Sequence, residues 1–438
     1  MSNSAEIIGD AGCSRRQFLG SSAKNAAGVA VGVVGLAESV AAGRSPDTVR
    51  LGVLGVRNQG RRLARAFAAL PNVEIASLCD IDQRVLEKSQ HEIDEIQGSC
   101  PRSEQDFRRV LDDDSVDAVV IATPDHWHAY MAVSACQAGK DLYLEIPVSH
   151  TVSDGRQIVA AAEAHGRVIQ TGLQQRSSAH FRTAIEYVQS GKLGAVRLAK
   201  AWTAHARKSI GYQPDAACPQ GVDYDLWLGP AAKRDFNPNR FHQNWRWNWD
   251  YGSGELGNWG VQMLDVARWG LGLGLPNRIS AHGGQFHFQD DQQTPDTMSV
   301  QYAYDDALLI WEHRQWSNHG IEGRSAATAF YGDRGVLVVD RGGWKVYQTS
   351  DASSGVGKHR LNEHCQDFVR SVLDRSEPAA DIRTGHLSST MCHLGNIAFR
   401  VGRELRWDDS AERFVADADA NRMLAGSCRG PWMTPQPM

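Results

Sequence analysis

Two glycines frame a short loop after the first strand-like run of the sequence. The run VRLGVLG leads into Gly55, Arg57, Asn58 and Gly60, which together read G-x-R-x-x-G. In the dinucleotide-binding pattern G-x-G-x-x-G, the first glycine makes a tight turn, the second admits a pyrophosphate and the third lets the next helix pack on the strand. Arg57 occupies the second position, where it either adds positive charge or crowds the site. The helix N-terminus that follows offers free N–H groups, so the loop predicts a phosphate-binding site.

An acidic residue ends the second strand-like run. Asp80 closes the segment IASLCD. At such a position a carboxylate accepts hydrogen bonds from an adenosine ribose and repels a 2′-phosphate. We therefore expect NAD rather than NADP as the cofactor. The alternative interpretation of Asp80 is an acid that caps the next helix.

A later segment places polar side chains at helical spacing. In GELGNWGVQMLDVARW, the residues Asn258, Gln262, Asp265 and Trp269 follow one another at intervals of four, three and four. They therefore share one face of a helix that can point at a cleft. Amide and carboxylate groups on such a face are suited to holding a small polar molecule.

An aromatic stretch precedes this helix. Residues 240–260, RFHQNWRWNWDYGSGELGNWG, hold four tryptophans among charged and amide side chains. Rigid aromatic faces such as that of Trp247 suit stacking on a sugar, and a plug between two domains is the other interpretation. Gln174 and Arg176, in TGLQQRSS, lie at the expected join of the domains and are further candidates for substrate binding.

The surrounding pattern predicts the elements that must position these residues. From Thr48 onward, short apolar runs alternate with stretches of helical periodicity, which argues for an α/β fold with a parallel sheet and crossover helices. Beyond Gln170 the segments TMSVQYAY, ALLIWEHRQW and GVLVVD read as neighbouring strands joined by short turns. We expect a Rossmann domain over 48–172, a substrate and oligomerisation domain over 173–385, and a C-terminal helix and tail over 386–438.

The N-terminal segment, residues 1–43, reads as a targeting signal. Arg15 and Arg16 stand in SRRQFLG, before a Gly/Ala-rich apolar run and then SVAAG. This segment resembles a twin-arginine export signal, which implies the twin-arginine machinery as a partner and a periplasmic or other extracytoplasmic location. An accidental Arg-Arg pair before an amphipathic helix is the alternative.

The composition and charge of the chain limit the kinds of molecule that it is expected to bind. The chain has 438 residues, which is long enough for two domains, and its net charge of -5 comes from interspersed acids and bases. That pattern gives no basic stripe for nucleic acid, and no run is long and apolar enough for a membrane span. The eight cysteines show no metal-ligand spacing, so neither zinc nor a disulfide framework is expected.

Several motifs together carry a family resemblance. They are VRLGVLG, LCDID, ATPDHWHA over residues 122–129, LYLEIP, the segment 254–269, YDLWLGPA and RVGRELRWD. By these motifs the chain resembles the glucose-fructose oxidoreductase and inositol dehydrogenase family, Gfo/Idh/MocA. The resemblance implies a Rossmann domain followed by an α+β domain whose mostly antiparallel open sheet walls the active site. It also implies a sugar or cyclitol substrate and a homo-oligomer.

The resemblance extends the candidate cofactor site. It adds Thr123, Pro124 and His126 from ATPDHWHA, and it implies that Glu145, from LYLEIP, orients the nicotinamide ribose. His128, in the same ATPDHWHA motif, comes near the nicotinamide end.

The chain departs from the family where the proton is handled. The family motif E-K-P reads Glu145-Ile146-Pro here, and D-x-G-x-H-x-x-D begins with Asn258, has Gln262 in place of histidine and keeps Asp265. Isoleucine, asparagine and glutamine cannot accept a hydroxyl proton near neutral pH. His128 and Asp265 are the expected substitutes, with more remote candidates at His150, His180, His205, Lys208 and His242.

Three functions remain open at this point. The first is an NAD-dependent oxidoreductase of sugars or cyclitols with a non-standard proton acceptor. The second is a catalytically silent family member that binds a nucleotide or a sugar. The third uses bound NAD transiently, as in elimination or in glycoside cleavage through a keto intermediate.

Overall fold

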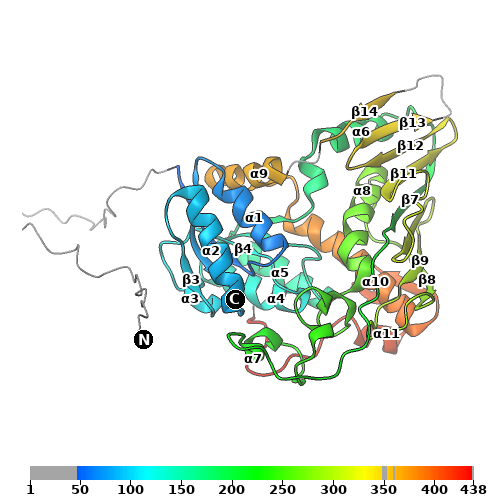
Figure 1. Ribbon diagram of the computed structural model, residues 1–438. Coiled ribbons are helices and arrows are strands. Elements are labelled where there is room, and N and C mark those ends of the chain that lie inside the picture. The colour runs from blue at the N-terminus through cyan, green and yellow to red at the C-terminus, as the bar shows by residue number, and fades with distance from the viewer. Residues whose placement is uncertain (1–46, 348–352, 359–360, 437–438) are drawn as a thin grey trace, which may run out of the picture. The chain divides into compact units, whose positions relative to one another are not determined.

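The computed structural model describes residues 47–347, 353–358 and 361–436 (Figure 1). The segment expected to be an export signal, residues 1–43, lies outside this part of the chain. The described residues form a parallel sheet flanked by helices and a larger second sheet with helices on one face.

A six-stranded parallel sheet forms the N-terminal domain, as predicted. Its order is β3-β2-β1-β4-β5-β6. The strands are β1 (Val49–Leu54), β2 (Val73–Cys79), β3 (Arg102–Glu104), β4 (Ala118–Ile121), β5 (Asp141–Leu144) and β6 (Ile169–Thr171). The helices between them are α1 (Gln59–Ala68), α2 (Gln83–Gln97), α3 (Phe107–Leu111), α4 (His128–Gln137) and α5 (Val152–Ala164).

The strand order reverses between β1 and β4. From β1 the chain crosses to β2 on one side, whereas β4 pairs with the opposite edge of β1. Such a switch point opens a crevice at the carboxyl ends of the strands, where ligands bind in open α/β sheets. The loops that follow β1, β2, β4 and β5 all meet at this edge, so they bring together Gly55, Asp80, Thr123 and Glu145.

The second sheet has ten strands and is antiparallel except where β7 runs parallel to β10, which confirms the expected mostly antiparallel sheet. Its order is β14-β13-β12-β11-β7-β10-β9-β8-β15-β16. The strands are β7 (Val196–Ala204), β8 (Arg278–Gly284), β9 (Thr297–Ala303), β10 (Leu308–Arg314), β11 (Ala326–Gly332), β12 (Gly335–Asp340), β13 (Gly343–Tyr347), β14 (Ser354–Val356), β15 (Leu405–Asp408) and β16 (Arg413–Phe414).

The predicted order of strands in this sheet was partly wrong. β9 and β10 pair directly, but β7 and β11 separate β10 from β12. The segment AATAFYG of β11 carried no strong strand signal. The parallel pairing of β7 with β10 joins segments that are far apart in the sequence, so no local pattern predicts it.

Helices line one face of the large sheet and connect it to the Rossmann domain. α8 (Val261–Leu271) packs on β7 and β11, beside α6 (Ala179–Gln189). α10 (Ile382–Val401) packs on α5, α8 and β8. Its long diagonal course can be followed in Figure 1. Its contacts on both sides tie the two domains together.

Two late segments cross the expected domain boundaries. α9 (Leu361–Asp374) contributes Cys365, Phe368 and Val369 to the buried core around β1 and α1, so it covers the Rossmann sheet. The stretch 386–438 contains most of α10, and also β15 and β16, which extend the large sheet. The remaining described α-helices are α7 (Tyr224–Leu228) and α11 (Ala418–Arg422).

Helices long and apolar enough to cross a bilayer do not occur in residues 47–347, 353–358 and 361–436. Within the same ranges, no group of three histidine, cysteine, aspartate or glutamate side chains is placed to hold a metal ion. Four of the seven described cysteines, Cys79, Cys136, Cys365 and Cys392, are buried.

Candidate active site

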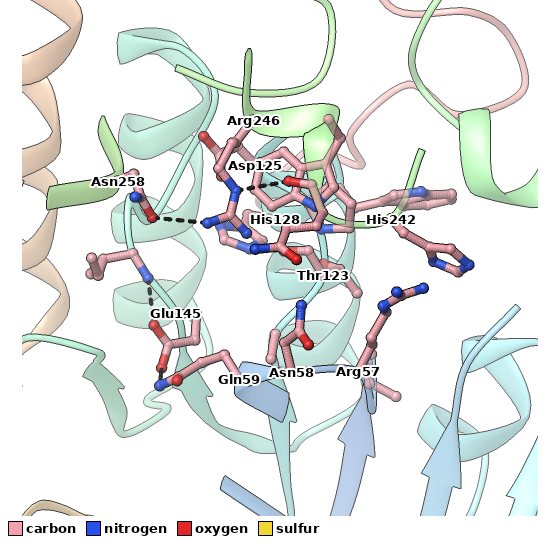
Figure 2. Close-up of a pocket in the computed structure, with 18 of the residues that line it drawn as sticks. Arg57, Asn58, Gln59, Thr123, Asp125, His128, Glu145, His242, Arg246 and Asn258 are labelled. Carbon is pink, nitrogen blue, oxygen red and sulfur yellow. Dashed lines mark hydrogen bonds between the residues drawn. The ribbon is translucent and has the colours of Figure 1, made fainter. Parts of the chain in front are cut away.

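A cleft of about 670 Å³ lies at the carboxyl ends of the Rossmann strands (Figure 2). Loops after β1, β2, β4 and β5 form its floor, and segments 241–262 and Arg341 of the second domain form the facing wall. In the view of Figure 2, Asn258 and Glu145 lie toward one side of the cleft, and Arg57 and His242 lie toward the other.

The glycine loop is built for close backbone approach. Gly55 has a φ of +81°, and a Cβ atom there would lie 2.8 Å from the carbonyl oxygen of Ala122. A Cβ on Gly60 would lie 1.7 Å from the carbonyl oxygen of Gly55. Asn58, with a φ of 43°, is held in the left-handed region and lines the cleft. Strained positions of this kind cluster at ligand sites, and the bare backbone at Gly55 and Gly60 fits a pyrophosphate.

Replacing Gly60 by Ala is expected to lower both the melting temperature and the affinity for NADH. The new methyl group has no room against backbone, and overpacking typically costs about 1–3 kcal/mol. Gly274→Ala is the matched control, because a Cβ there meets nothing within 4 Å. Thermal unfolding and NADH titration of both variants measure the effect, and equal NADH affinity in both would contradict the role given to Gly60.

Asp80 anchors the glycine loop and also lines the cleft. Its Oδ2 accepts a hydrogen bond from the backbone N–H of Val56 at 2.9 Å, and its Oδ1 accepts one from Asp82 N–H at 3.1 Å. Burial raises the pKa of Asp80 to about 6. The cap of α2 is Asp82, whose side chain accepts from Arg84 N–H, so the alternative role of Asp80 as helix cap is wrong.

Glu145 lines the cleft at the end of β5. Its Oε1 accepts from Gln59 Nε2 at 2.9 Å, and its Oε2 accepts from the backbone N–H of Ile146 at 3.3 Å. Burial raises the pKa of Glu145, and the hydrogen bond from Gln59 opposes that shift. Because β2 and β5 lie on opposite sides of β1 and β4, a dinucleotide spanning the strand ends would have one ribose beside Asp80 and the other beside Glu145.

Arginines supply positive charge beside the glycine loop. Arg57, Arg61 and Arg62 all line the cleft there. His242 lies beside Asp82, with its Nε2 3.1 Å from the Asp82 Oδ2, and burial lowers the His242 pKa to about 4. The other remote candidates, His150, His180, His205 and Lys208, do not line this cleft.

His128 lines the cleft but is held by backbone. Its Nδ1 lies 2.8 Å from the carbonyl oxygen of Pro147, and its Nε2 lies 3.0 Å from that of Thr123. Burial lowers the pKa of His128 to about 4. With both ring nitrogens facing carbonyl oxygens, this geometry argues against the predicted role of His128 as proton acceptor. Thr123 and Pro124 do line the cleft.

Two aromatic candidates face away from the cleft. The Nε2 of His126 lies 3.1 Å from the carbonyl oxygen of Trp227, and its ring lines a separate cavity of about 330 Å³. Trp247 is 6% exposed and packs under the guanidinium group of Arg207, 5.2 Å from the ring centre. The predicted cofactor role of His126 and sugar-stacking role of Trp247 are therefore corrected to structural ones.

The predicted helix face divides along its length. Asn258 lies in a π-helical turn, η5 (Leu256–Gly260), and with Gln262 at the start of α8 it lines the cleft. Asp265 and Trp269 do not line the cleft. Asp265 lies two helical turns beyond Asn258, about 10 Å along the axis, where the segment η2 (Gln174–Ser177) covers the helix. The shared face is real, but only its first half reaches the ligand space.

Asp265 forms a buried ion cluster instead. It is 1% exposed and accepts from Arg176 Nε and NH2 at 2.7 and 2.9 Å. Ser388 Oγ donates to it at 2.7 Å, and Arg268 NH2 lies 3.6 Å away. The predicted catalytic role of Asp265 and substrate role of Arg176 are corrected to packing roles. Gln174 reaches the cleft and donates from Nε2 to the hydroxyl of Tyr143 at 3.3 Å.

Asp125 is an acidic cleft residue that the sequence analysis passed over. It is 3% exposed, and Ser253 Oγ donates to its Oδ2 at 2.6 Å. Burial raises the pKa of Asp125 to about 7, against the lowering effects of Ser253 and Arg246. Asp125 stands inside ATPDHWHA, between two residues that were assigned to the cofactor, so its position was the available signal.

Two more cleft residues were missed. Arg246 stands in the aromatic stretch, and its NH1 lies 3.5 Å from Asn258 Oδ1. Arg341, in the turn between β12 and β13, donates to Gln262 Oε1 and lies over the ring of Trp259 at 4.6 Å. No local pattern marks Arg341, because only the fold of the large sheet brings this turn to the cleft.

Comparisons with known proteins agree with this architecture. The model of the Gfo/Idh/MocA family described as "Oxidoreductase family, NAD-binding Rossmann fold" matches residues 49–173. The model described as "Oxidoreductase family, C-terminal alpha/beta domain" matches residues 200–434, more than half of the chain.

Individual relatives are more distant. A "Glycosyl hydrolase family 109 protein" of Shewanella pealeana is 34% identical over 169 residues, and one of Saccharopolyspora erythraea is 32% identical over 257 residues. These matches span 37% and 55% of the two relatives and 34% and 51% of this chain. A solved levoglucosan dehydrogenase, in complex with NADH and levoglucosan, is 16% identical with a TM-score of 0.65, covering 82% of this chain and 99% of that chain.

The levoglucosan dehydrogenase shares the fold, and the two family models match the Rossmann domain and the domain that follows it. The chain therefore belongs to the Gfo/Idh/MocA family of NAD-binding oxidoreductases.

Proposed function

We propose that this chain is an NAD-dependent oxidoreductase that oxidises a CH–OH group of a sugar, cyclitol or derivative, with Asp125 as the acceptor of the hydroxyl proton. The observation that carries this proposal is the carboxyl group of Asp125 in the cleft, with Ser253 as its hydrogen-bond donor. Ile146 and Gln262, which occupy the family's proton-handling positions, cannot supply that chemistry, and neither can Asn258 beside them.

The residues around the glycine loop fit the cofactor. The bare backbone of Gly55 and Gly60 leaves room for the pyrophosphate, and Arg57 offsets its negative charge. Asp80 and Glu145 accept hydrogen bonds from the hydroxyls of the two riboses. When bound, NAD accepts the hydride that leaves the carbinol carbon. Asn258 and Gln262 offer amide groups that orient the sugar hydroxyls.

Asp125 is suited to the proton because its pKa lies near neutral pH. A carboxyl group with a pKa of about 7 is partly ionised at neutral pH and is basic enough to take a hydroxyl proton. Ser253 Oγ–H stabilises the ionised form at Oδ2, which leaves Oδ1 for the substrate. The protonated acid forms as the substrate carbon becomes a ketone.

The experiment that tests the cofactor half of this proposal is mass spectrometry of small molecules released from the purified protein. NAD or NADH is expected in the released fraction, or tight binding on titration if none co-purifies. If the protein neither carries nor binds a dinucleotide, the oxidoreductase proposal fails and the silent, sugar-binding interpretation replaces it.

A second candidate function is glycoside cleavage through a transient ketone. The relative from Shewanella pealeana and the relative from Saccharopolyspora erythraea favour this route, because each is named a glycosyl hydrolase family 109 protein. The same oxidation by the same residues would then start the reaction. Release of nitrophenol from an aryl glycoside without net NADH formation would identify this route, and net NADH formation from a free sugar would identify the dehydrogenase.

We also propose export by the twin-arginine route and assembly into a homo-oligomer. The export proposal rests on Arg15 and Arg16 in SRRQFLG, and the oligomer on the family resemblance. Cell fractionation of the wild type and of an Arg15→Lys, Arg16→Lys variant tests export, and light scattering of the purified protein tests assembly. An unchanged periplasmic fraction in the variant, or a monomer in solution, would contradict the respective proposal.

A further inference from the structure

Two arginines on the facing wall of the cleft form no ion pair with an acid of the described residues. Arg246 donates from Nε to the carbonyl oxygen of Gln243 at 2.9 Å and from NH1 to Asn258 Oδ1 at 3.5 Å. Arg341 donates from NH2 to Gln262 Oε1, and its buried Nε has no hydrogen-bond partner. Within residues 47–347, 353–358 and 361–436, neither guanidinium group forms an ion pair with a carboxylate.

A third arginine in the same cleft shows the contrast. Arg207 donates from NH2 to both carboxylate oxygens of Glu255 at 2.8 Å, so its charge is neutralised inside the protein. Glu255 is 1% exposed and Asn258 Nδ2 also donates to it, at 3.3 Å. Glu255 is thus already paired with Arg207. Glu255 and Asp125 attract Arg246, and Glu145 attracts Arg341, only from beyond ion-pair distance.

Both unpaired arginines are held in place on the same wall. Asn258 and Gln262 accept from them, and these two residues lie one helical turn apart, about 6 Å along the axis. Trp259 lies under Arg341, and Trp245 lies under Arg246 with its ring centre 5.4 Å away. Aromatic faces and amide oxygens position the two guanidinium forks without neutralising them.

Each of these guanidinium charges is half removed from water, which is unfavourable unless an anion joins it. The pyrophosphate of NAD belongs at the glycine loop beside Arg57, whereas Arg246 and Arg341 donate to Asn258 and Gln262, the residues assigned to the sugar. A guanidinium fork matches the planar or tetrahedral oxygens of a carboxylate, sulfate or phosphate group.

We propose that the substrate is a sugar that bears an oxyanion, such as a uronic acid or a sugar sulfate, and that Arg246 and Arg341 together clamp that group. This inference rests on the proposal that a sugar binds in this cleft. Asp125 then acts on a hydroxyl of the same ring, and the clamp fixes which carbon faces the nicotinamide. Neutral sugars would bind without this anchor.

Binding measurements test the clamp independently of turnover. Calorimetric titration of the protein, with and without NADH, would compare glucuronate, galacturonate and glucose 6-sulfate with glucose and galactose. We expect at least one of the anionic sugars to bind tenfold or more tightly than its neutral counterpart. Uronates and the sulfate separate the carboxylate source from the sulfate source. Equal binding of neutral and anionic sugars would overturn the proposal.

Variants of the two arginines locate the effect. Arg246→Gln and Arg341→Gln are each expected to weaken the anionic sugar about tenfold and the neutral sugar less than twofold. Arg341→Lys should keep part of the preference, because the charge remains and the fork is lost. Arg57→Gln removes the same charge at the opposite side of the cleft, and it should weaken NADH while leaving the sugar preference unchanged.

The outcomes separate this proposal from the proposed function. If Arg341→Gln and Arg246→Gln weaken NADH instead of the anionic sugar, the two arginines serve the cofactor and the clamp is wrong. Preferential binding of anionic sugars without any NAD reduction would leave the clamp standing and contradict the oxidoreductase. NAD reduction by neutral sugars alone would support the oxidoreductase and contradict the clamp. Circular dichroism of each variant confirms that the folds are comparable.

Discussion

Replacing Asp125 by Asn is expected to lower kcat for sugar oxidation by about 10²- to 10⁴-fold, the range typical of a lost general base. Asparagine keeps the size of the side chain and can still pair with Ser253, but it cannot accept a proton. NADH binding should stay within twofold of the wild type, because the Asp125 side chain is held by Ser253 of the facing wall and asparagine keeps its size. Steady-state kinetics and NADH titration of the same preparation measure both effects.

The pH dependence of the two proteins should differ in the same experiment. Because burial raises the pKa of Asp125 to about 7, the wild-type kcat should rise as the pH increases through that value and Asp125 loses its proton. Asp125→Asn should lack this rise. Ser253→Ala serves as the control, since it removes only the donor to Oδ2 and should shift the rise to higher pH. A wild-type profile retained in Asp125→Asn would show that another group takes the proton.

Replacing Asp265 by Ala is expected to destabilise the fold by about 3–5 kcal/mol, because it leaves Arg176 and Arg268 buried without their carboxylate. Asp265 is 1% exposed and accepts two hydrogen bonds from Arg176 and one from Ser388. Denaturant unfolding measures the free energy of unfolding. Few single changes away from the cleft should cost as much.

Asp306→Ala provides the matched control for this prediction. Asp306 pairs with Arg197 at the surface, where the side chains are 70% and 64% exposed, so its loss should cost less than about 1 kcal/mol. If Asp265→Ala instead left stability unchanged and abolished turnover, the catalytic role predicted from the helical spacing would be restored.

The Rossmann half of the protein could be predicted from sequence because its signals are local. β1, β2, β4 and β5 read as apolar runs, each followed by a glycine, acid or polar residue at its carboxyl end. Parallel strands bring those ends to one edge, so Gly55, Asp80, Thr123 and Glu145 were placed together correctly in the cleft. The large sheet was harder, because β7 pairs in parallel with β10 across a long stretch of chain.

The errors at the site have a common physical cause. Periodicity predicted the helix face that holds Asn258 and Gln262, but it could not show that η2 covers the following turns. Asp265 was therefore predicted to reach the substrate, whereas it pairs with Arg176. The proton acceptor was sought at His128 and Asp265, whereas Asp125 is a buried carboxyl group whose pKa is raised toward neutral pH by desolvation. Burial of that kind is a property of the fold and has no signature in the sequence.

The most direct test of the account is a single-turnover reaction followed by the absorbance of NADH. Wild-type protein and Asp125→Asn are each mixed with NAD and the sugar that binds most tightly, below and above the pKa of about 7. The account predicts NADH formation by the wild type, faster above that pH, and little or none by Asp125→Asn. Absence of NADH in the wild type, with NAD and sugar both bound, would contradict hydride transfer in this cleft.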